Sequence, residues 1–307
     1  MYDLIIVGGG PAGVSAGVYA ARKRLKTLLI TESFGGQSVD SMGVQNWIGT
    51  ISIAGPALAM ALEAHLRAYA PGIVDIETGK RADKISKSGD GFEVTAGGKT
   101  HKGKTIFIAS GSTRRKLDVP GAKEFENKGI TYCASCDGPL FADADTVVIG
   151  GGNAGFETAA QLLAYAKSVT LLHHTDHFKA DEATVEMVLM HPKMKSIKMA
   201  DTTEIFGDKF VKGLKYKDLA TGEMHTLEAT GVFVEIGLLP NTMLAEGLLE
   251  MNKYKQIVTD PRTQRTSVTG IWAAGDCTDG LFHQNNIASG DAVKALEDIY
   301  LFIHTGK

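Results

Sequence analysis

Two cysteines separated by two residues are the clearest chemical signal in this sequence. Residues 132–138 read YCASCDG and contain Cys133, Cys136 and, directly after them, Asp137. Two thiols at this spacing can form and break a reversible disulfide, in which a thiolate of lowered pKa attacks or leaves. Asp137 can act as general acid or base toward the departing thiolate. We therefore predict a redox-active disulfide with Cys133, Cys136 and Asp137 as catalytic residues.

Other roles for the three cysteines of the chain fit less well. Three cysteines in 307 residues cannot form a disulfide framework, and they are too few for a four-cysteine zinc site. No histidine pair follows the CxxC segment at zinc-finger spacing, so we predict no metal site. The alternative is that the two thiols are buried and paired by chance. Cys277 stands alone and is expected to be a small core residue.

Two glycine-rich segments have the spacing of dinucleotide-binding loops. The first, GGGPAG at residues 8–13, lies between an apolar run at 2–7 and a helical pattern at 14–22. In this motif the first glycine allows a tight turn, the second lets a pyrophosphate approach the backbone, and the third lets the helix pack closely. The helix N-terminus favours phosphate charge, and an acid nineteen residues after the last glycine can hold a ribose hydroxyl. The residues predicted to surround this ligand are Gly8, Gly10, Pro11, Ala12, Gly13 and Glu32.

The second segment, GGGNAG at residues 150–155, has the same strand, loop and helix setting. Residues 173–179, which begin eighteen residues beyond its last glycine, read HHTDHFK. An acid at this strand end favours NADH and arginines favour the 2′-phosphate of NADPH, but neither stands at the strand end itself, and Asp176 lies three residues beyond it. We expect solvated loop histidines rather than a metal site, because adjacent strand residues face opposite ways. The residues assigned to a nicotinamide nucleotide are Gly150, Gly152, Asn153, Ala154, Gly155, His173 and His174.

These loops require two β-α-β units, and the sequence repeats one pattern at an offset of 142 positions. The strand, helix and strand of the first unit are expected at 2–7, 14–22 and 27–31, and those of the second at 146–149, 156–166 and 168–172. Strands of a small β layer are expected at 91–95 and 104–109, a loop out of the first domain at 110–115, a second exit at 237–241, and a final helix at 287–302. The predicted fold class is therefore α/β, with two Rossmann-like, doubly wound, three-layer nucleotide-binding domains.

Composition and charge exclude several classes of protein. Lys and Arg number 32 and Asp and Glu 35, so the net charge is 32 − 35 = −3 and no basic patch serves a nucleic acid. Glycine supplies 36 of 307 residues, about 12% against an average near 7%, which indicates many tight turns. Residues 4–21 carry no charge, but their glycines and proline favour strand, turn and helix over a membrane span. No targeting segment is visible, so we expect a soluble cytoplasmic protein without a membrane partner.

The whole chain resembles the low-molecular-weight thioredoxin reductases and the flavoprotein subunit of alkyl hydroperoxide reductase. The shared motifs are GGGPAG, GGQ at 35–37, VQNWIG at 44–49, ASCDG at 134–138, GGGNAG and AGD at 274–276. CDGPLF at 136–141, KAD at 179–181 and GLLPNT at 237–242 are especially similar to the peroxide-reductase flavoprotein. That flavoprotein carries an extra N-terminal thioredoxin-like region that has no counterpart here, so we expect the architecture of a thioredoxin reductase.

The resemblance implies an FAD site and a division of labour between the cysteines. It places Cys136 toward the flavin and Cys133 toward a protein disulfide, and it puts His283 where the family usually has arginine. It implies an FAD-binding domain at 1–114 and 243–307, and an inserted pyridine-nucleotide domain at 115–242 that carries the CxxC segment. Because one cysteine pair must meet both the flavin and a bulky protein partner, we expect a domain rotation, with hinges near 113–116 and 239–241. Besides the first glycine loop and Glu32, the FAD residues implied are Gly36, Gln37, Asn46, Gly111, Gly275, Asp276, His283, Gln284 and Asn285.

The electron donor is the point at which the sequence departs from its relatives. Members that use NADPH have His-Arg-Arg in the stretch that begins at His173, and peroxide-reductase relatives that prefer NADH have a glutamate there; this chain has neither. We expect an FAD-dependent disulfide reductase that takes electrons from NADH or NADPH, with NADH favoured, and acts as a homodimer on a thioredoxin-like protein. Reduced ferredoxin or a deazaflavin is the alternative donor. A flavin-binding redox sensor without turnover is the alternative from another class, and a ferredoxin–NADP reductase is disfavoured because such enzymes lack the CxxC pair.

Overall fold

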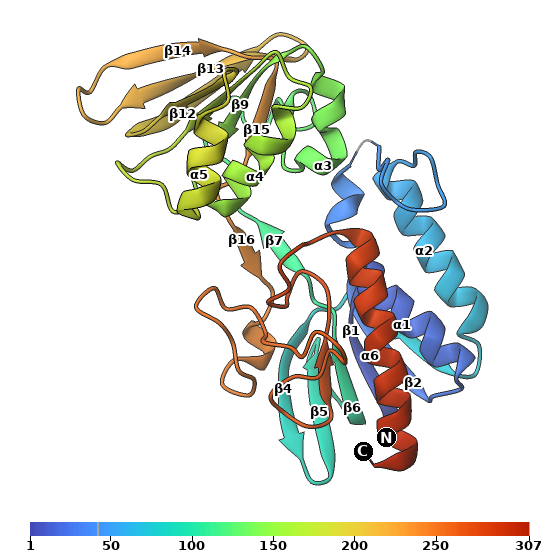
Figure 1. Ribbon diagram of the computed structural model, residues 1–307. Coiled ribbons are helices and arrows are strands. Elements are labelled where there is room, and N and C mark those ends of the chain that lie inside the picture. Colours follow the sequence, from blue (N-terminus) through green and yellow to red (C-terminus); the bar gives the residue numbers. More distant parts are fainter. Residues whose placement is uncertain (42, 307) are drawn as a thin grey trace. The chain divides into compact units, whose positions relative to one another are not determined.

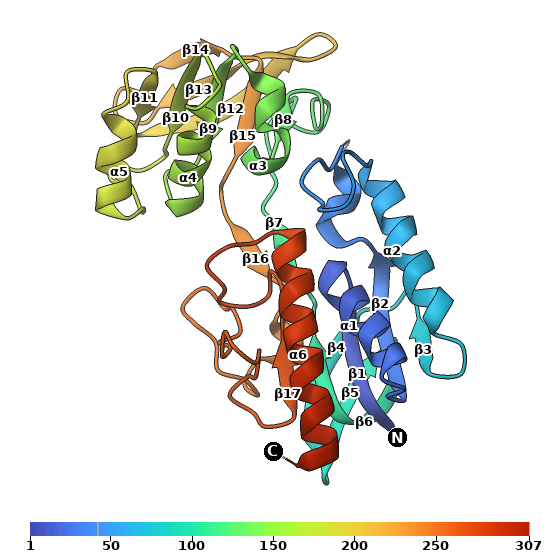
Figure 2. The ribbon, with the colours of Figure 1, turned by 45° about the vertical axis from the view of Figure 1, so that its right-hand side comes forward.

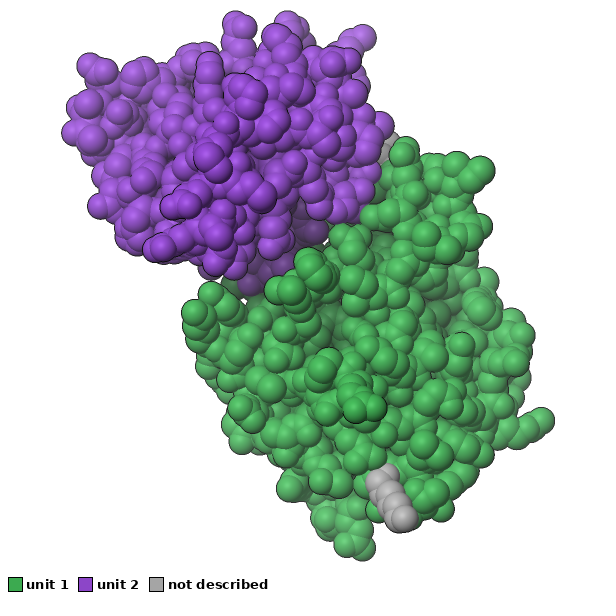
Figure 3. All heavy atoms as spheres, in the orientation of Figure 1, with its two compact units in different colours: residues 1–113, 239–307 green, residues 114–238 purple. Residues whose placement is uncertain are grey.

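The computed structural model (Figures 1 and 2) describes residues 1–41 and 43–306 and consists of two compact units (Figure 3). Unit 1 contains residues 1–113 and 239–307, and unit 2 contains residues 114–238. Unit 2 is therefore an insertion in the chain of unit 1. Each unit has its own parallel sheet and its own core.

A seven-stranded sheet forms the centre of unit 1, in the order β3-β2-β1-β6-β5-β4, with β17 paired to β6. The parallel strands are β1 (Tyr2–Gly9), β2 (Thr27–Phe34), β3 (Val74–Glu77), β6 (Lys99–Ile108) and β17 (Ile271–Ala273). The antiparallel strands are β4 (Ala82–Ser88) and β5 (Gly91–Ala96). Strand β1 is buried on both faces, because Leu4 and Ile6 join one core while Ile5 and Val7 join another. The apolar run at 2–7 is thus a central strand, as predicted.

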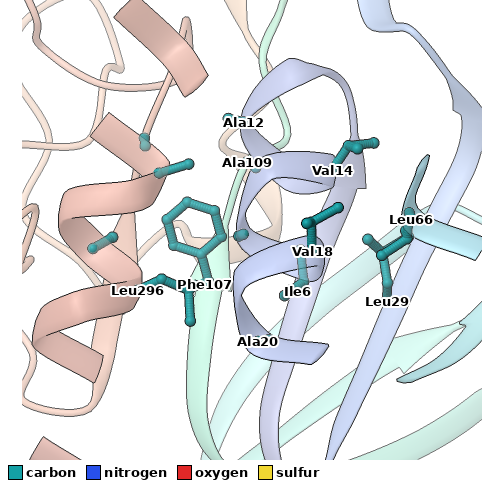
Figure 4. Close-up of a cluster of buried hydrophobic side chains, with 14 of the residues drawn as sticks. Ile6, Ala12, Val14, Val18, Ala20, Leu29, Leu66, Phe107, Ala109 and Leu296 are labelled. Carbon is teal, nitrogen blue, oxygen red and sulfur yellow. The ribbon is translucent and has the colours of Figure 1, made fainter. Parts of the chain in front are cut away.

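Three helices cover one face of this sheet: α1 (Pro11–Arg22), α2 (Gly55–Tyr69) and α6 (Asn285–Thr305). Helix α1 packs against both α2 and α6, and Phe107 of β6 is buried between α1 and α6 (Figure 4). The opposite face is covered by the segment that follows the second exit, including the short helix η3 (Met243–Ala245) and the buried Cys277. The C-terminal segment of the chain therefore completes the core of unit 1. Its aromatic end packs on that core, with the rings of Trp272 and Phe302 5.3 Å apart.

Unit 2 repeats the parallel arrangement with five strands in the order β11-β10-β9-β15-β8. These strands are β8 (Ile130–Thr131), β9 (Asp145–Ile149), β10 (Ser168–Leu172), β11 (Met194–Ile197) and β15 (Gly231–Val234). Helices α4 (Asn153–Leu162) and α5 (Glu182–Leu189) cover one face, together with α3 (Ala134–Asp137) and η2 (Gly138–Phe141). A three-stranded antiparallel sheet covers the other: β12 (Ala200–Gly207), β13 (Val211–Asp218) and β14 (Met224–Glu228). The resulting three layers confirm the predicted fold class of two Rossmann-like domains.

The two chain crossings between the units are not loops throughout. Strands β7 (Ser112–Arg114) and β16 (Leu238–Pro240) pair into a two-stranded sheet. Hydrogen bonds flank this pair, from Arg115 N to Gly237 O at 3.0 Å and from Asn241 N to Gly111 O at 2.9 Å. The prediction of a loop at 110–115 was therefore wrong at 112–114, because the partner strand lies more than a hundred residues away and leaves no local pattern. Within the described residues, no helix combines the length and hydropathy that a membrane span requires.

Candidate redox site and nucleotide loops

The CxxC segment forms a closed disulfide at the start of α3. Cys133 is the N-cap of this helix and is bonded to Cys136, with 5.3 Å between their Cα atoms. The carbonyl of Cys133 accepts hydrogen bonds from the N–H groups of Cys136 and Asp137, at 3.2 and 3.0 Å. The segment is thus a single helical turn that holds both sulfurs and the neighbouring carboxyl together.

Contacts with α4 and with Tyr165, three residues beyond its end, hold this turn in place. Ser135 Oγ donates to Gln161 Oε1 at 3.0 Å. Gly138 lies against Tyr165, where an added Cβ would stand 2.4 Å from the phenol oxygen, so no larger residue fits there without displacing Tyr165. The disulfide therefore rests on the same helix that begins at the second glycine loop.

Asp137 has the environment of a proton-transfer group. Burial raises the pKa of its carboxyl above the usual range, while a hydrogen bond from Thr131 Oγ1 and the charge of Arg114 act in the opposite direction. Thr131 Oγ1 also accepts from the Cys133 N–H at 3.4 Å, so one hydroxyl contacts both ends of the turn. A carboxyl of raised pKa keeps its proton to a higher pH than an ordinary aspartate does, and in its protonated form it can protonate a departing thiolate.

The first glycine loop in unit 1 divides into positions that the fold requires and one that it does not. Gly8 has φ of +116°, and a Cβ there would lie 2.1 Å from Ala109 O. A Cβ on Gly13 would lie 1.9 Å from Gly8 O, because α1 packs directly on the strand end. Gly10 has ordinary extended dihedrals, and its nearest neighbour would be Gly36 Cα at 3.8 Å. Packing therefore leaves Gly10 free, and its missing side chain provides room for a ligand.

Segments far apart in sequence supply polar groups beside this loop. Gln37 Nε2 donates to Asp276 Oδ2 at 3.1 Å and to Ser112 Oγ at 3.0 Å. Asn46 Nδ2 donates to Gln284 Oε1 at 3.1 Å. Asn285 belongs to the same set, because its Oδ1 accepts from Ser38 Oγ at 3.0 Å. The structure thus joins in pairs residues that the family resemblance assigned to a flavin.

The remaining residues assigned to the flavin have separate positions. Gly275 lies between helices α1 and α6, where a Cβ would be 3.6 Å from Ala12 Cβ and 3.4 Å from Ala288 Cβ. Glu32 is an exposed residue of β2, and Gly111 has no atom of the described chain within 4 Å of an added Cβ. His283 precedes α6, and its Nε2 is buried without a hydrogen-bond partner among the described residues. An orphaned buried nitrogen, an open glycine and converging amides together fit a polar dinucleotide such as FAD.

The second glycine loop has the same geometry as the first. Gly150 has φ of +125°, and its Cβ would lie 2.2 Å from Glu235 O, while a Cβ on Gly155 would lie 1.9 Å from Gly150 O. An added Cβ on Gly152 would meet nothing within 4 Å. Asn153 Oδ1 accepts from the Asp181 N–H at 2.9 Å, which ties the loop to the start of α5. Of these residues, Gly152 is the one that packing leaves open to a ligand.

His173 corrects one of the sequence predictions. We expected a solvated loop histidine, but His173 is 9% exposed and its Nδ1 accepts from the Gly151 N–H at 3.0 Å. Its Nε2 lies 2.7 Å from Thr175 Oγ1 and 2.9 Å from His177 O, and because Nδ1 is the acceptor, Nε2 carries the proton and donates. Burial lowers the pKa of the ring. The ring of His173 therefore holds the backbone of the glycine loop at Gly151, while His174 and His177 are exposed.

Sequence reasoning missed Glu235, the residue that follows β15. Its Oε1 accepts from Thr158 Oγ1 of α4 at 2.8 Å. Burial raises the pKa of this carboxyl to about 7, against the opposing charge of Arg114 and the Thr158 hydrogen bond. An alignment of the two repeats would have signalled it, because FIASG at 107–111 matches FVEIG at 233–237 and places Ala109 opposite Glu235.

The chain has two Rossmann-like units, a dinucleotide loop in each unit, and a CxxC disulfide. Together these features define the class of nucleotide-dependent disulfide oxidoreductases. Comparison with known families agrees: the profile of the family described as pyridine nucleotide-disulphide oxidoreductase matches residues 2–292, and the chain belongs to this family. The family match and the matching thioredoxin reductase structures support a flavoprotein disulfide oxidoreductase.

Individual relatives have two different architectures. The chain is 42% identical over 295 residues to an NADH dehydrogenase of Bacillus subtilis and 40% identical over 296 residues to a component of the alkyl hydroperoxide reductase of Escherichia coli. Each match covers 96% of this chain but 57% of the relative, so the chain spans little more than half the length of these relatives. Thioredoxin reductases of Streptococcus pyogenes and Giardia duodenalis superpose with TM-scores of 0.91 and 0.94 at 33% and 32% identity, over 99% of both chains. The predicted family resemblance is confirmed.

Proposed function

We propose that the protein is an FAD-dependent disulfide reductase that passes electrons from a reduced donor to a thioredoxin-like protein. The observation that carries this proposal is the Cys133–Cys136 disulfide with Asp137, a carboxyl of raised pKa, in the same helical turn. When bound, FAD supplies the reversible two-electron chemistry that links a donor to a disulfide. We assign FAD to unit 1, at the loop of residues 8–13 and the polar groups of Gln37, Asn46 and Asp276.

The residues of the disulfide turn have complementary roles in the proposed reaction. The Cys133–Cys136 bond accepts two electrons and breaks; one sulfur becomes a thiolate, and the other takes the proton that Asp137 supplies. The Cys133 thiolate then attacks the disulfide of the partner and forms a mixed disulfide. Cys136 attacks Cys133 in turn, which restores the internal disulfide and releases the partner as a dithiol, its protons drawn from Cys136 and from solvent. Asp137 regains its proton from solvent before the next turnover.

For the donor we propose NADH, bound at the loop of residues 150–155 in unit 2. The open position of Gly152 supports a dinucleotide there. No arginine stands at residues 173–179 to hold a 2′-phosphate, which argues against NADPH. Reduced ferredoxin is the second candidate, favoured by the one observation that the ring of His173 is committed to the protein backbone rather than offered to a ligand.

The assembly and the movement of the enzyme are proposals of the same kind. By resemblance to thioredoxin reductases we propose a homodimer, which size-exclusion chromatography with light scattering tests. One disulfide must serve both a flavin and a protein partner, so we propose that unit 2 rotates about the paired strands β7 and β16 during the cycle. Cross-linking of the two strands by an engineered disulfide should slow turnover without loss of FAD.

Three cysteine variants test the assignment. Cys133→Ser and Cys136→Ser should retain FAD, seen by its visible absorbance, and lose turnover of a thioredoxin disulfide. Cys277→Ser is the matched control; burial raises the pKa of Cys277 to about 11, so its thiol is not a nucleophile, and turnover should be retained. Stopped-flow bleaching of the flavin by NADH, NADPH or reduced ferredoxin identifies the donor. Full turnover by Cys136→Ser would refute the electron route, and a flavin bleached by reduced ferredoxin but not by NADH would refute the donor.

A further inference from the structure

Glu235 lies at the point of unit 2 where the strand order reverses. Strands β9 and β15 are parallel neighbours, with Ile149 paired to Val234, and β10 lies on the other side of β9. Ligands of doubly wound sheets bind at such a switch point, beyond the carboxyl ends of the two strands. Gly150 is the first residue beyond β9 and Glu235 the first beyond β15. Glu235 and the glycine loop therefore follow neighbouring strands at this switch point.

The equivalent position in unit 1 shows that the fold does not need a carboxyl there. Ala109 N donates to Val7 O at 2.8 Å, and Glu235 N donates to Ile149 O at the same distance. The carbonyl oxygens of Ala109 and Glu235 lie equally close to the first glycine of the adjacent loop. A Cβ added to Gly8 would be 2.1 Å from Ala109 O, and one added to Gly150 would be 2.2 Å from Glu235 O. Unit 1 thus makes the same backbone contacts with a methyl side chain. The carboxyl of Glu235 is an addition that the architecture leaves optional.

The side chain of Glu235 lies against α4, the helix whose N-terminus forms the second half of the loop. Thr158 is buried, and its Oγ1 donates to Glu235 Oε1 at 2.8 Å. Among the described residues, the charged groups that act on Glu235 are Arg114 from β7, which favours the carboxylate, and Glu157 from α4, which opposes it. Burial is the largest influence, and with these neighbours it raises the pKa of Glu235 to about 7. The free protein therefore holds a mixture of both protonation states near neutrality.

We propose that Glu235 takes up a proton when a pyridine dinucleotide binds at residues 150–155, so that unit 2 binds this ligand more weakly as pH rises through neutrality. The inference rests on the proposed function, in which unit 2 holds the donor. The diphosphate of a dinucleotide is anionic, and it would bind where Gly152 leaves room, beside the carboxyl end of β15. An ionised Glu235 repels that charge, whereas a protonated Glu235 does not and can donate a hydrogen bond to a ligand oxygen.

The size of the effect follows from linkage. If binding raises the pKa of Glu235 by a further unit, from about 7, the dissociation constant rises about fivefold between pH 6 and pH 8. At a pH midway between the free and bound pKa values, binding takes up about half a proton from the buffer. Both quantities are measured on binding itself and need no turnover.

Isothermal titration calorimetry of the 307-residue holoprotein with tetrahydro-NADH, a non-reducing analogue, tests the proposal. Titrations at pH 6 and pH 8, each in two buffers of different ionisation enthalpy, give the dissociation constant and the proton uptake. Wild type should show the fivefold change and the uptake, and Glu235→Gln should show neither. Glu186→Gln is the matched control, because Glu186 is an exposed glutamate of α5 in the same unit that does not act on the pKa of Glu235, and its variant should keep both effects. Glu235→Ala, which reproduces Ala109 of unit 1, is a second variant should the glutamine not fold.

Equal affinity at both pH values in wild type, or an unchanged pH dependence in both Glu235 variants, overturns the proposal and leaves the proposed function intact. Absence of binding at both pH 6 and pH 8 overturns the proposal together with the assignment of a nicotinamide donor. The disulfide reductase activity is judged separately: protein reduced with dithionite should still reduce a thioredoxin disulfide. Failure of that reaction would refute the function whatever the titrations show.

Discussion

Substitution of the middle glycine of each loop separates ligand binding from folding. Gly10 has φ of −74° and ψ of −175°, which alanine adopts without strain, and an added Cβ would lie 3.8 Å from its nearest neighbour. Gly10→Ala should therefore change the free energy of unfolding of the flavin-free protein by less than about 1 kcal/mol, because the smaller loss of conformational entropy is opposed by the loss of glycine at the N-cap of α1. The same methyl group occupies the space in which a diphosphate would approach the backbone.

The expected loss of binding is larger than the expected change in stability. A hydrogen bond from backbone N–H to a charged group contributes about 1.5–3 kcal/mol, so loss of one such contact should weaken FAD binding about ten- to a hundredfold. Gly8→Ala is the contrasting variant: φ of +116° and a Cβ 2.1 Å from Ala109 O should destabilise unit 1 by about 2 kcal/mol or more, with or without flavin.

Two measurements check these expectations. Thermal or urea unfolding of the flavin-free variants gives the stability change, and quenching of flavin fluorescence on titration gives the affinity. A Gly10→Ala protein that binds FAD as tightly as wild type would refute the assignment of this loop to the pyrophosphate. A Gly10→Ala protein destabilised without flavin as strongly as Gly8→Ala would refute the interpretation of its packing. Gly152→Ala should repeat the pattern in unit 2, with FAD retained and nicotinamide binding weakened.

Three further predictions concern titrating or buried polar groups. The pKa of Glu235 is about 7 in the folded protein against 4.5 unfolded, so the folded state is most stable below pH 4.5, where the carboxyl is protonated in both states, and it loses stability as pH rises through 7. Over this range the unfolding free energy of wild type, measured with urea at several pH values, should fall by about 3 kcal/mol more than that of Glu235→Ala. The same pH dependence in both proteins would contradict the burial argument. Thr131→Val removes a hydrogen bond that lowers the pKa of Asp137, so the limb of the pH–rate profile that this carboxyl controls should move to higher pH, and an unmoved profile would exclude Asp137 as its source. His173→Ala leaves a buried loop N–H unpaired and should cost about 1–3 kcal/mol in unfolding free energy, whereas His174→Ala, at an exposed neighbour, should change it by less than about 0.5 kcal/mol; equal effects would contradict the corrected role of His173.

The sequence predicted the chemistry-bearing segments because each is fixed by local covalent and steric requirements. A glycine loop needs a strand before it, a helix after it and glycines where φ is positive or the helix packs on the strand, and all of this is written in about thirty consecutive residues. The CxxC pair likewise needs only one helical turn to bring its sulfurs together. These features gave the fold class, the family and the position of the disulfide.

Tertiary structure decided the features that depend on residues distant in the chain. Gln37 meets Asp276 across 239 positions and Thr158 meets Glu235 across 77, and no local period encodes either contact. Burial, which also depends on the whole fold, turned His173 from an expected solvent-facing residue into the support of the second loop. The sequence by itself therefore determined which groups this protein brings to its chemistry. Only the folded chain determined which of them are buried, paired and able to hold a proton near neutral pH, because desolvation and charge proximity are properties of packing rather than of order along the chain.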